Sequence, residues 1–187
     1  MTNDRSPSFS RDQVTGAAGN AIVRSALELC GYRVYPFGHE STFTSLKQRL
    51  WELHLVGKSR ELSYRIRSMP DLIVEGKDEL WLTEVKFRTN RDIPGRGQGV
   101  RFKNWEILKC KQYWSEALLV LLTPYGDRFY AERMVDLEVD PQNTNADTWF
   151  TFDSFKKLPH FLPPTAGKLE PFWVAIDNLA TLWRTTP

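Results

Sequence analysis

The stretch of sequence that decides the fold is residues 70–87, PDLIVEGKDELWLTEVKF. Two apolar segments flank Glu75-Gly76-Lys77-Asp78, a tetrapeptide made of residues that favour turns. The pattern predicts a β-hairpin with strands over residues 71–74 and 80–87. Because side chains alternate along a strand, one face of the second strand suits the core. That face carries Trp81, Thr83, Val85 and Phe87, and the opposite face carries Leu82, Glu84, Lys86 and Arg88.

This hairpin brings two acidic side chains and a lysine together. If the turn centres on Lys77-Asp78, Asp71 lies directly across from Glu84, with the two Cβ atoms roughly 5 Å apart. Lys86 follows on the same face as Glu84, about 6–7 Å along the strand. Two carboxylates this close repel each other unless a cation lies between them, and Mg²⁺ or Mn²⁺ is the hard, oxygen-seeking candidate.

A divalent cation held in this way suits hydrolysis of a phosphodiester. It lowers the pKa of a bound water and offsets the charge that develops at phosphorus. Lys86 is placed either to orient or deprotonate the attacking water, or to pair with the phosphoryl oxygens as a point charge.

An alternative interpretation needs no catalysis. An Asp that follows Pro is common in turns, and Glu-x-Lys on a strand can form an exposed ion pair. Two features favour the catalytic interpretation. The strand over residues 81–87 is too apolar for a sheet edge, so Glu84 and Lys86 need partners. A segment rich in arginine and glycine follows directly, over residues 88–100.

The rest of the chain predicts a mixed α/β domain. The expected helices cover residues 15–31, 43–57, 104–116 and a terminal segment from Pro171. The expected strands cover residues 32–35, 62–66, 117–122 and a strand pair within 128–139. Residues 88–100 are expected to form a loop.

Pro70-Asp71, twelve intervening residues and then Glu84-Val85-Lys86 resemble the signature of the PD-(D/E)XK nuclease superfamily. That superfamily includes restriction endonucleases and archaeal-type Holliday junction resolvases. Residues 16–34 also resemble its first helix and strand, and the helix and apolar strand that end at Leu122 resemble its last two core elements. The resemblance therefore extends over residues 16–123. It implies an α/β fold with a restriction-endonuclease-like αβββαβ core, a mixed central sheet flanked by helices.

The expected organisation has three parts. They are a flexible leader over residues 1–14, the nuclease-like core over residues 15–124, and a C-terminal extension over residues 125–187 packed on the core.

The resemblance also implies roles for individual residues. Asp71 and Glu84 would be metal ligands, the Val85 carbonyl a third ligand, and Lys86 the catalytic lysine. Many members carry a Glu on the first helix where this chain has Asn20, which supplies no charge but can hold a metal-bound water. Some relatives carry a Gln on the second core helix, for which Gln112 is the candidate.

The basic residues are concentrated in the middle of the chain. Residues 47–111 hold 15 Lys and Arg against nine Asp and Glu, although the whole chain has a net charge of only +2. A solvated surface would also show this excess, but next to a nuclease centre we expect contacts with DNA phosphates. The expected contacts are Arg88, Arg91, Arg96, Arg101 and Lys103. Gly95-Arg96-Gly97-Gln98-Gly99 lacks the Gly-Lys-Ser/Thr of a P-loop, so no nucleotide triphosphate is expected.

Seven tryptophans are many for this length, and three of them flank the basic middle: Trp51, Trp105 and Trp114. Base stacking and core packing both remain open for them, and core packing is favoured.

Composition limits the function classes further. No stretch approaches about 20 apolar residues and the polar start lacks a secretory signal, so we expect a cytoplasmic protein without a membrane partner. Two cysteines cannot build a disulfide framework. The sequence therefore predicts a Mg²⁺-dependent (or Mn²⁺-dependent) DNA endonuclease, and a twofold homodimer would suit cutting of both strands. The alternative is a catalytically inactive nuclease-fold module that binds nucleic acid or a protein.

Overall fold

The computed structural model describes residues 7–38, 60–89, 92–93, 95, 97–161 and 169–185. Its centre is a six-stranded sheet with the strand order β1-β2-β3-β6-β7-β9. The strands are β1 (Arg33–Pro36), β2 (Leu72–Glu75), β3 (Leu80–Phe87), β6 (Leu118–Leu122), β7 (Phe129–Arg133) and β9 (Lys156–Lys157). β3 and β6 run parallel and the other neighbouring pairs run antiparallel, so the sheet is mixed.

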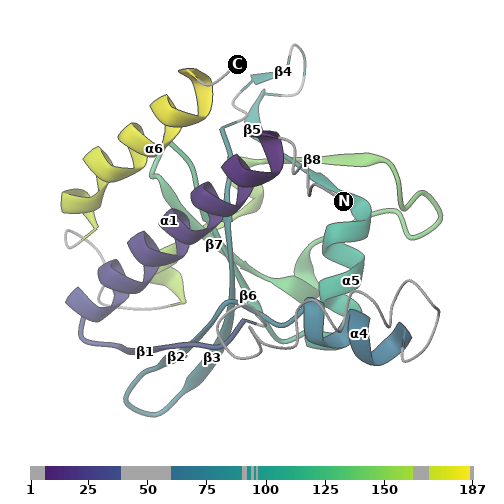
Figure 1. Cartoon of the computed structure of the whole chain (residues 1–187), viewed down its shortest axis with the longest axis horizontal. Helices are drawn as coiled ribbons and strands as arrows, with labels where there is room; N and C mark the ends of the chain where they lie inside the picture. The colour runs from purple at the N-terminus through teal and green to yellow at the C-terminus, as the bar shows by residue number, and fades with distance from the viewer. Residues whose placement is uncertain are drawn as a thin grey trace, which may run out of the picture.

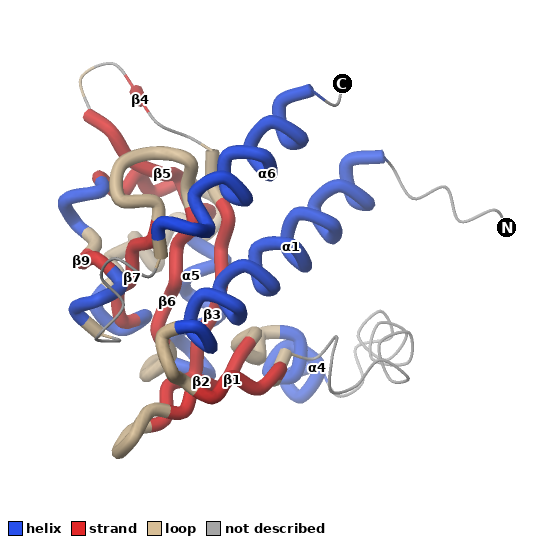
Figure 2. Tube along the Cα trace, turned by 90° about the vertical axis from the view of Figure 1, so that its left-hand side faces the viewer, coloured by secondary structure: helices blue, strands red, loops and turns tan. Residues whose placement is uncertain are grey.

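Helices cover both faces of this sheet. α1 (Pro7–Leu29) and α6 (Trp173–Thr185) lie side by side on one face (Figure 1, Figure 2). α5 (Asn104–Trp114) covers the other face. A second sheet, with the order β4-β5-β8, packs on the α5 side. Its strands are β4 (Asp92–Ile93), β5 (Gly97–Lys103) and β8 (Asp147–Thr151).

The strand β6 explains why the sheet has two apolar sides. All five of its residues are buried, because Leu118, Val120 and Leu122 pack toward α1 and α6 while Leu119 and Leu121 pack toward α5. Such a continuous apolar strand is typical of a sheet covered on both faces. The arrangement α1, β1, β2, β3, α5, β6 confirms the predicted order of the core, and the fold is consistent with a restriction-endonuclease-like architecture.

The hairpin, the strand β6 and the helix α5 form where the sequence predicts them. The strand predicted over residues 62–66 is wrong, because these residues belong to α4 (Arg60–Arg67). Leu62 and Ile66 are one helical turn apart, so their spacing satisfies a helix as well as a strand. Ser68 ends this helix by donating its hydroxyl to the carbonyls of Tyr64 and Arg65, at 2.8 and 3.0 Å.

Three other boundaries differ from the prediction. The segment expected as a loop over residues 88–100 contains β4 and the start of β5, and α1 begins at Pro7, so residues 7–14 of the expected leader are helical. Residues 128–139 form one strand, β7, followed by a 3₁₀ turn at Met134–Asp136. Further 3₁₀ turns cover Phe152–Ser154, Leu158–His160 and Glu170–Phe172, the last of which precedes α6.

Two further expectations concern helices. The helix predicted over residues 43–57 lies outside the described residues. None of the helices in the described part of the chain is long and apolar enough to cross a membrane.

A substitution at Gly99 tests how closely the strands of the second sheet pack. It pairs with Thr151 on β8, and a Cβ at this position would lie 2.1 Å from the carbonyl oxygen of Phe150. We expect Gly99→Ala to lower the free energy of unfolding by about 2–3 kcal/mol, because backbone atoms must move apart. Urea unfolding measures this. The control is Gly16→Ala on α1, where nothing lies within 4 Å, and it should be neutral or stabilising by up to about 1 kcal/mol.

Candidate active site

The register of the hairpin sets the positions of the two acidic residues. Leu72 on β2 pairs with Thr83 on β3. The residue before Leu72 is Asp71 and the residue after Thr83 is Glu84, so this antiparallel register places Asp71 opposite Glu84. β2 begins only after Asp71, so Asp71 lies at the point where β3 loses its neighbouring strand.

Asp71 is held by hydrogen bonds at both its side chain and its backbone. Its carboxylate oxygen Oδ2 accepts the backbone N–H of Val85 at 2.8 Å. Its backbone carbonyl accepts the N–H groups of Phe37 and Gly38, which follow β1, at 2.8 and 3.1 Å. The carboxylate therefore takes the place of a missing strand partner on β3, and this contact fixes where its second oxygen points.

The Val85 carbonyl lies on the same side of β3. The N–H and the carbonyl of one strand residue point to the same side of the strand, and the Val85 N–H points to Asp71. The other side of β3 is occupied by β6. There the backbone N–H of Arg88 donates to the Leu122 carbonyl at 2.9 Å. The Val85 carbonyl thus faces Asp71 rather than β6.

Glu84 and Lys86 form an ion pair on the α5 face of the sheet, with 2.5 Å between Lys86 Nζ and Glu84 Oε1. Their side chains are only 15% and 30% exposed, respectively. Burial raises the pKa of Glu84 to about 7, an effect that Lys86 opposes and the charge of Asp71 reinforces. Burial lowers the pKa of Lys86, but the carboxylates of Glu84 and Asp71 raise it more, to about 12.

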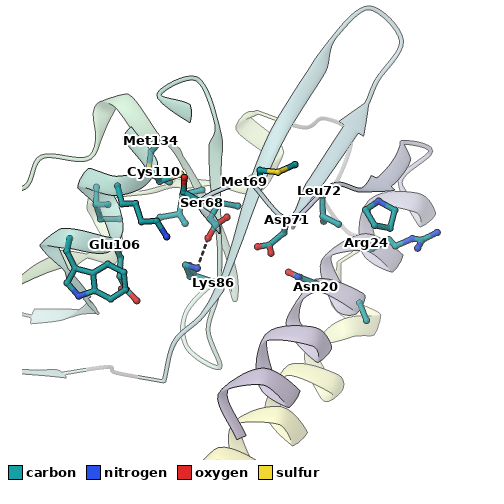
Figure 3. Close-up of a pocket in the computed structure, with 18 residues that line it drawn as sticks. Asn20, Arg24, Ser68, Met69, Asp71, Leu72, Lys86, Glu106, Cys110 and Met134 are labelled. Carbon is teal, nitrogen blue, oxygen red and sulfur yellow. Dashed lines mark hydrogen bonds and ion pairs between the residues drawn. The ribbon is translucent and has the colours of Figure 1, made fainter. Parts of the chain in front are cut away.

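A cavity of about 480 Å³ joins these groups (Figure 3). Asp71, Glu84 and Lys86 line it, as does Asn20 from α1. Figure 3 shows the Asn20 amide pointing toward Asp71. Four residues that the sequence predicts for the site therefore share one cavity.

The donor set of this cavity fits a hard divalent cation. Glu84 is paired with Lys86 and Glu106 with Arg88, whereas Asp71 forms no ion pair within the described part of the chain. No cluster of three or more His, Cys, Asp or Glu side chains suited to a metal occurs among the described residues. The carboxylates of Asp71 and of Glu84, the latter shared with Lys86, line the cavity, and the Val85 carbonyl faces Asp71 although Val85 does not line it. Mg²⁺ accepts so sparse a set when water and phosphate oxygens complete its shell.

The other predicted site residues lie elsewhere. Gln112 is exposed and does not line the cavity. Arg88 pairs with Glu106 at 3.0 Å, and its guanidinium lies 4.9 Å from the centre of the Phe102 ring. Arg101 and Lys103 are each 51% exposed and pair with Asp147, at 3.5 and 2.9 Å. Arg91 and Arg96 lie outside the described residues.

Several cavity residues were not predicted for the site. Arg24 on α1 and Lys109 on α5 both line it, and so does Trp105, for which core packing was favoured. Arg24 lies four residues after Asn20 on α1, and this helical spacing is the signal that could have identified it. No comparable sequence signal identifies Trp105 and Lys109, since neither lies one turn from a predicted site residue that lines the cavity. Cys110 also lines the cavity, but burial raises the pKa of its thiol to about 12, so a thiolate nucleophile is not available there.

Comparisons with known proteins give a likeness in structure alone. No protein-family model matches the chain, and no curated protein sequence matches it significantly. A similar solved structure is that of Hjc, a Holliday junction resolvase from the archaeal hyperthermophile Archaeoglobus fulgidus. It is 11% identical in sequence with a TM-score of 0.48, and the match covers 79% of this chain and 94% of that chain.

The raised pKa of Glu84 predicts a pH-dependent stability in the metal-free protein. Its folded value of about 7 exceeds the ordinary value of 4.5, so the native state binds more protons between these values. Stability from Glu84 is therefore present at pH 5 and is lost as the pH rises through 7. We expect the wild type to lose about 1–3 kcal/mol relative to Glu84→Gln between pH 5 and pH 8. Urea unfolding of both proteins in EDTA measures this, and parallel pH profiles would contradict it.

Proposed function

We propose that this protein is a metal-dependent endonuclease that hydrolyses phosphodiester bonds of DNA. The observation that carries the proposal is the fixed Asp71 carboxylate beside the Glu84–Lys86 ion pair in one cavity. A buried ion pair adds little net stability, because the loss of hydration offsets its attraction, and strongly shifted pKa values gather at functional sites.

Each residue of the cavity takes a defined role in this proposal. Asp71, Glu84 and the Val85 carbonyl would hold Mg²⁺ or Mn²⁺, and the bound ion supplies charge stabilisation and an activated water. With a pKa of about 12, Lys86 is an ammonium at neutral pH. In this proposal, Lys86 would pair with a phosphoryl oxygen as a positive charge or orient the attacking water. Asn20 holds a water molecule beside Asp71.

DNA is the proposed substrate because basic residues line the cavity and project from the strand that precedes its α5 wall. Arg101 and Lys103 project from β5, which continues directly into α5, and α5 contributes Lys109 to the cavity wall. The pairing of Arg101 and Lys103 with Asp147 leaves half of each side chain exposed. In this proposal, these cations would contact phosphates of a strand that enters the cavity.

Removal of the site residues should abolish cleavage. We expect Asp71→Ala, Glu84→Ala and Lys86→Ala each to lower the rate with Mg²⁺ or Mn²⁺ by about 100-fold or more while the protein remains folded. A panel of linear, nicked, branched and single-stranded DNA measures the rate, and circular dichroism checks the fold. Glu75→Gln is the matched control, since it removes a carboxylate at the far end of the same hairpin, outside the cavity. A wild-type rate in any of the three variants would refute this assignment.

Asn20 favours a second candidate function, a nuclease-fold module that binds nucleic acid or a protein without cutting. It places an amide beside Asp71 where a third acid would strengthen metal binding.

Metal titration separates the two functions. For an enzyme, we expect Mn²⁺ to raise the melting temperature of the wild type, because ligands that bind only the native state stabilise it. Asp71→Asn should lose this effect and Asn20→Glu should increase it. An unchanged melting temperature in the wild type, together with no cleavage of any DNA, would favour the binding module.

A further inference from the structure

Trp105, the second residue of α5, lies on the rim of the cavity with 48% of its surface exposed. Other tryptophans of the chain pack against neighbouring rings. Trp81 meets Phe161 edge-on at 6.3 Å, and Trp114 meets Phe37 edge-on at 6.0 Å. In the described part of the chain, no such ring contact and no cation covers the Trp105 indole. A large aromatic side chain is thus kept accessible beside the candidate active site.

The backbone that carries Trp105 is firmly anchored. The N–H of Trp105 donates to the Thr144 carbonyl at 3.0 Å. The preceding residue, Asn104, is buried; its amide donates to the Asn143 carbonyl at 2.8 Å and accepts the Thr148 hydroxyl at 2.5 Å. The indole is therefore carried by an ordered helix start, and little backbone entropy is lost when a ligand covers it.

We propose that Trp105 stacks on an unpaired nucleobase of the DNA whose phosphate enters the cavity. This inference rests on the proposed function and names the substrate class of the same site. A nucleotide joins an anionic phosphate to a flat aromatic base, and the cavity joins the cations Lys86 and Lys109 to an accessible indole on its rim.

The stacking geometry selects among DNA structures. In a continuous duplex, both faces of each base are covered by neighbouring base pairs. An indole reaches a face only where the base is unpaired, displaced or at an end. The protein therefore prefers DNA that carries single-stranded bases near the bond to be cut.

Binding to two oligonucleotides of equal charge tests this proposal. One is a dye-labelled single strand of mixed sequence, and the other has the same number of phosphates but abasic sugars throughout. Fluorescence anisotropy in EDTA measures the affinities without cleavage. We expect the wild type to bind the base-bearing strand at least about five-fold more tightly than the abasic strand. Trp105→Ala should lose most of this preference and keep the affinity for the abasic strand within about two-fold, whereas Trp105→Phe should retain part of the preference.

Leu80→Ala is the matched control, because Leu80 is exposed but lies outside the cavity. The proposal is overturned if Trp105→Ala lowers the affinities for both strands equally or changes neither affinity. A protein partner would then be the occupant to seek. Cleavage of the DNA panel by the wild type is scored separately. If the wild type cuts DNA and Trp105→Ala shows an unchanged base preference, only the stacking role fails. If no DNA is cut, the proposed function fails, and the two affinities still decide the role of Trp105.

Discussion

The hydrogen bond from the Val85 N–H to the Asp71 carboxylate is the contact on which the candidate site depends. It forms where β2 has not yet joined β3, so an acidic side chain completes a ladder that a strand would otherwise complete. The same residue is tied through its carbonyl to the end of β1. The position of Asp71 is consequently set by the pairing of three strands rather than by the choice of one rotamer, which gives the fold direct control over the site.

The burial of Glu84 turns this placement into an electrostatic strain. Glu84 and Lys86 interrupt an apolar strand next to the fully buried β6, and their ion pair only partly offsets the lost hydration. Asp71 adds a second negative charge that no ion pair compensates in the described structure. The pKa of Glu84, raised to about 7 chiefly by burial, shows that the site favours added positive charge. Protonation of Glu84 relieves this strain, and a divalent cation held by the same carboxylates would compete with the proton.

Local pattern predicts the parts of this structure that local interactions determine. The alternation through Thr83, Val85 and Phe87 identifies the buried face of β3, and the turn at residues 76–79 determines the register that sets Asp71 opposite Glu84. The remaining features depend on partners distant in sequence. The spacing of Leu62 and Ile66 fits a strand and a helix equally, and Gly99 suggests a loop until the carbonyl of Phe150 is placed beside it. The rotation of α5, which turns Trp105 and Lys109 to the cavity and Gln112 to solvent, follows from packing alone.

Asn20 gives the site a different balance from one with three acids. Each further carboxylate increases the repulsion between acids in the metal-free state, and it increases the free energy gained when a cation binds. With an amide at position 20, the repulsion between acids and the gain in free energy on cation binding are both smaller. More of a bound cation's shell would then come from water and from the substrate phosphate. In the proposed function, binding of a metal and binding of DNA would be coupled, because each would supply a ligand or a charge that the other lacks, and such coupling acts equally in both directions. The cations Lys86, Lys109 and Arg24 around the cavity would attract that phosphate, although Lys86 and Arg24 also pair with Glu84 and Glu28. Under the proposed function, a site of this composition would bind its metal together with its substrate rather than beforehand.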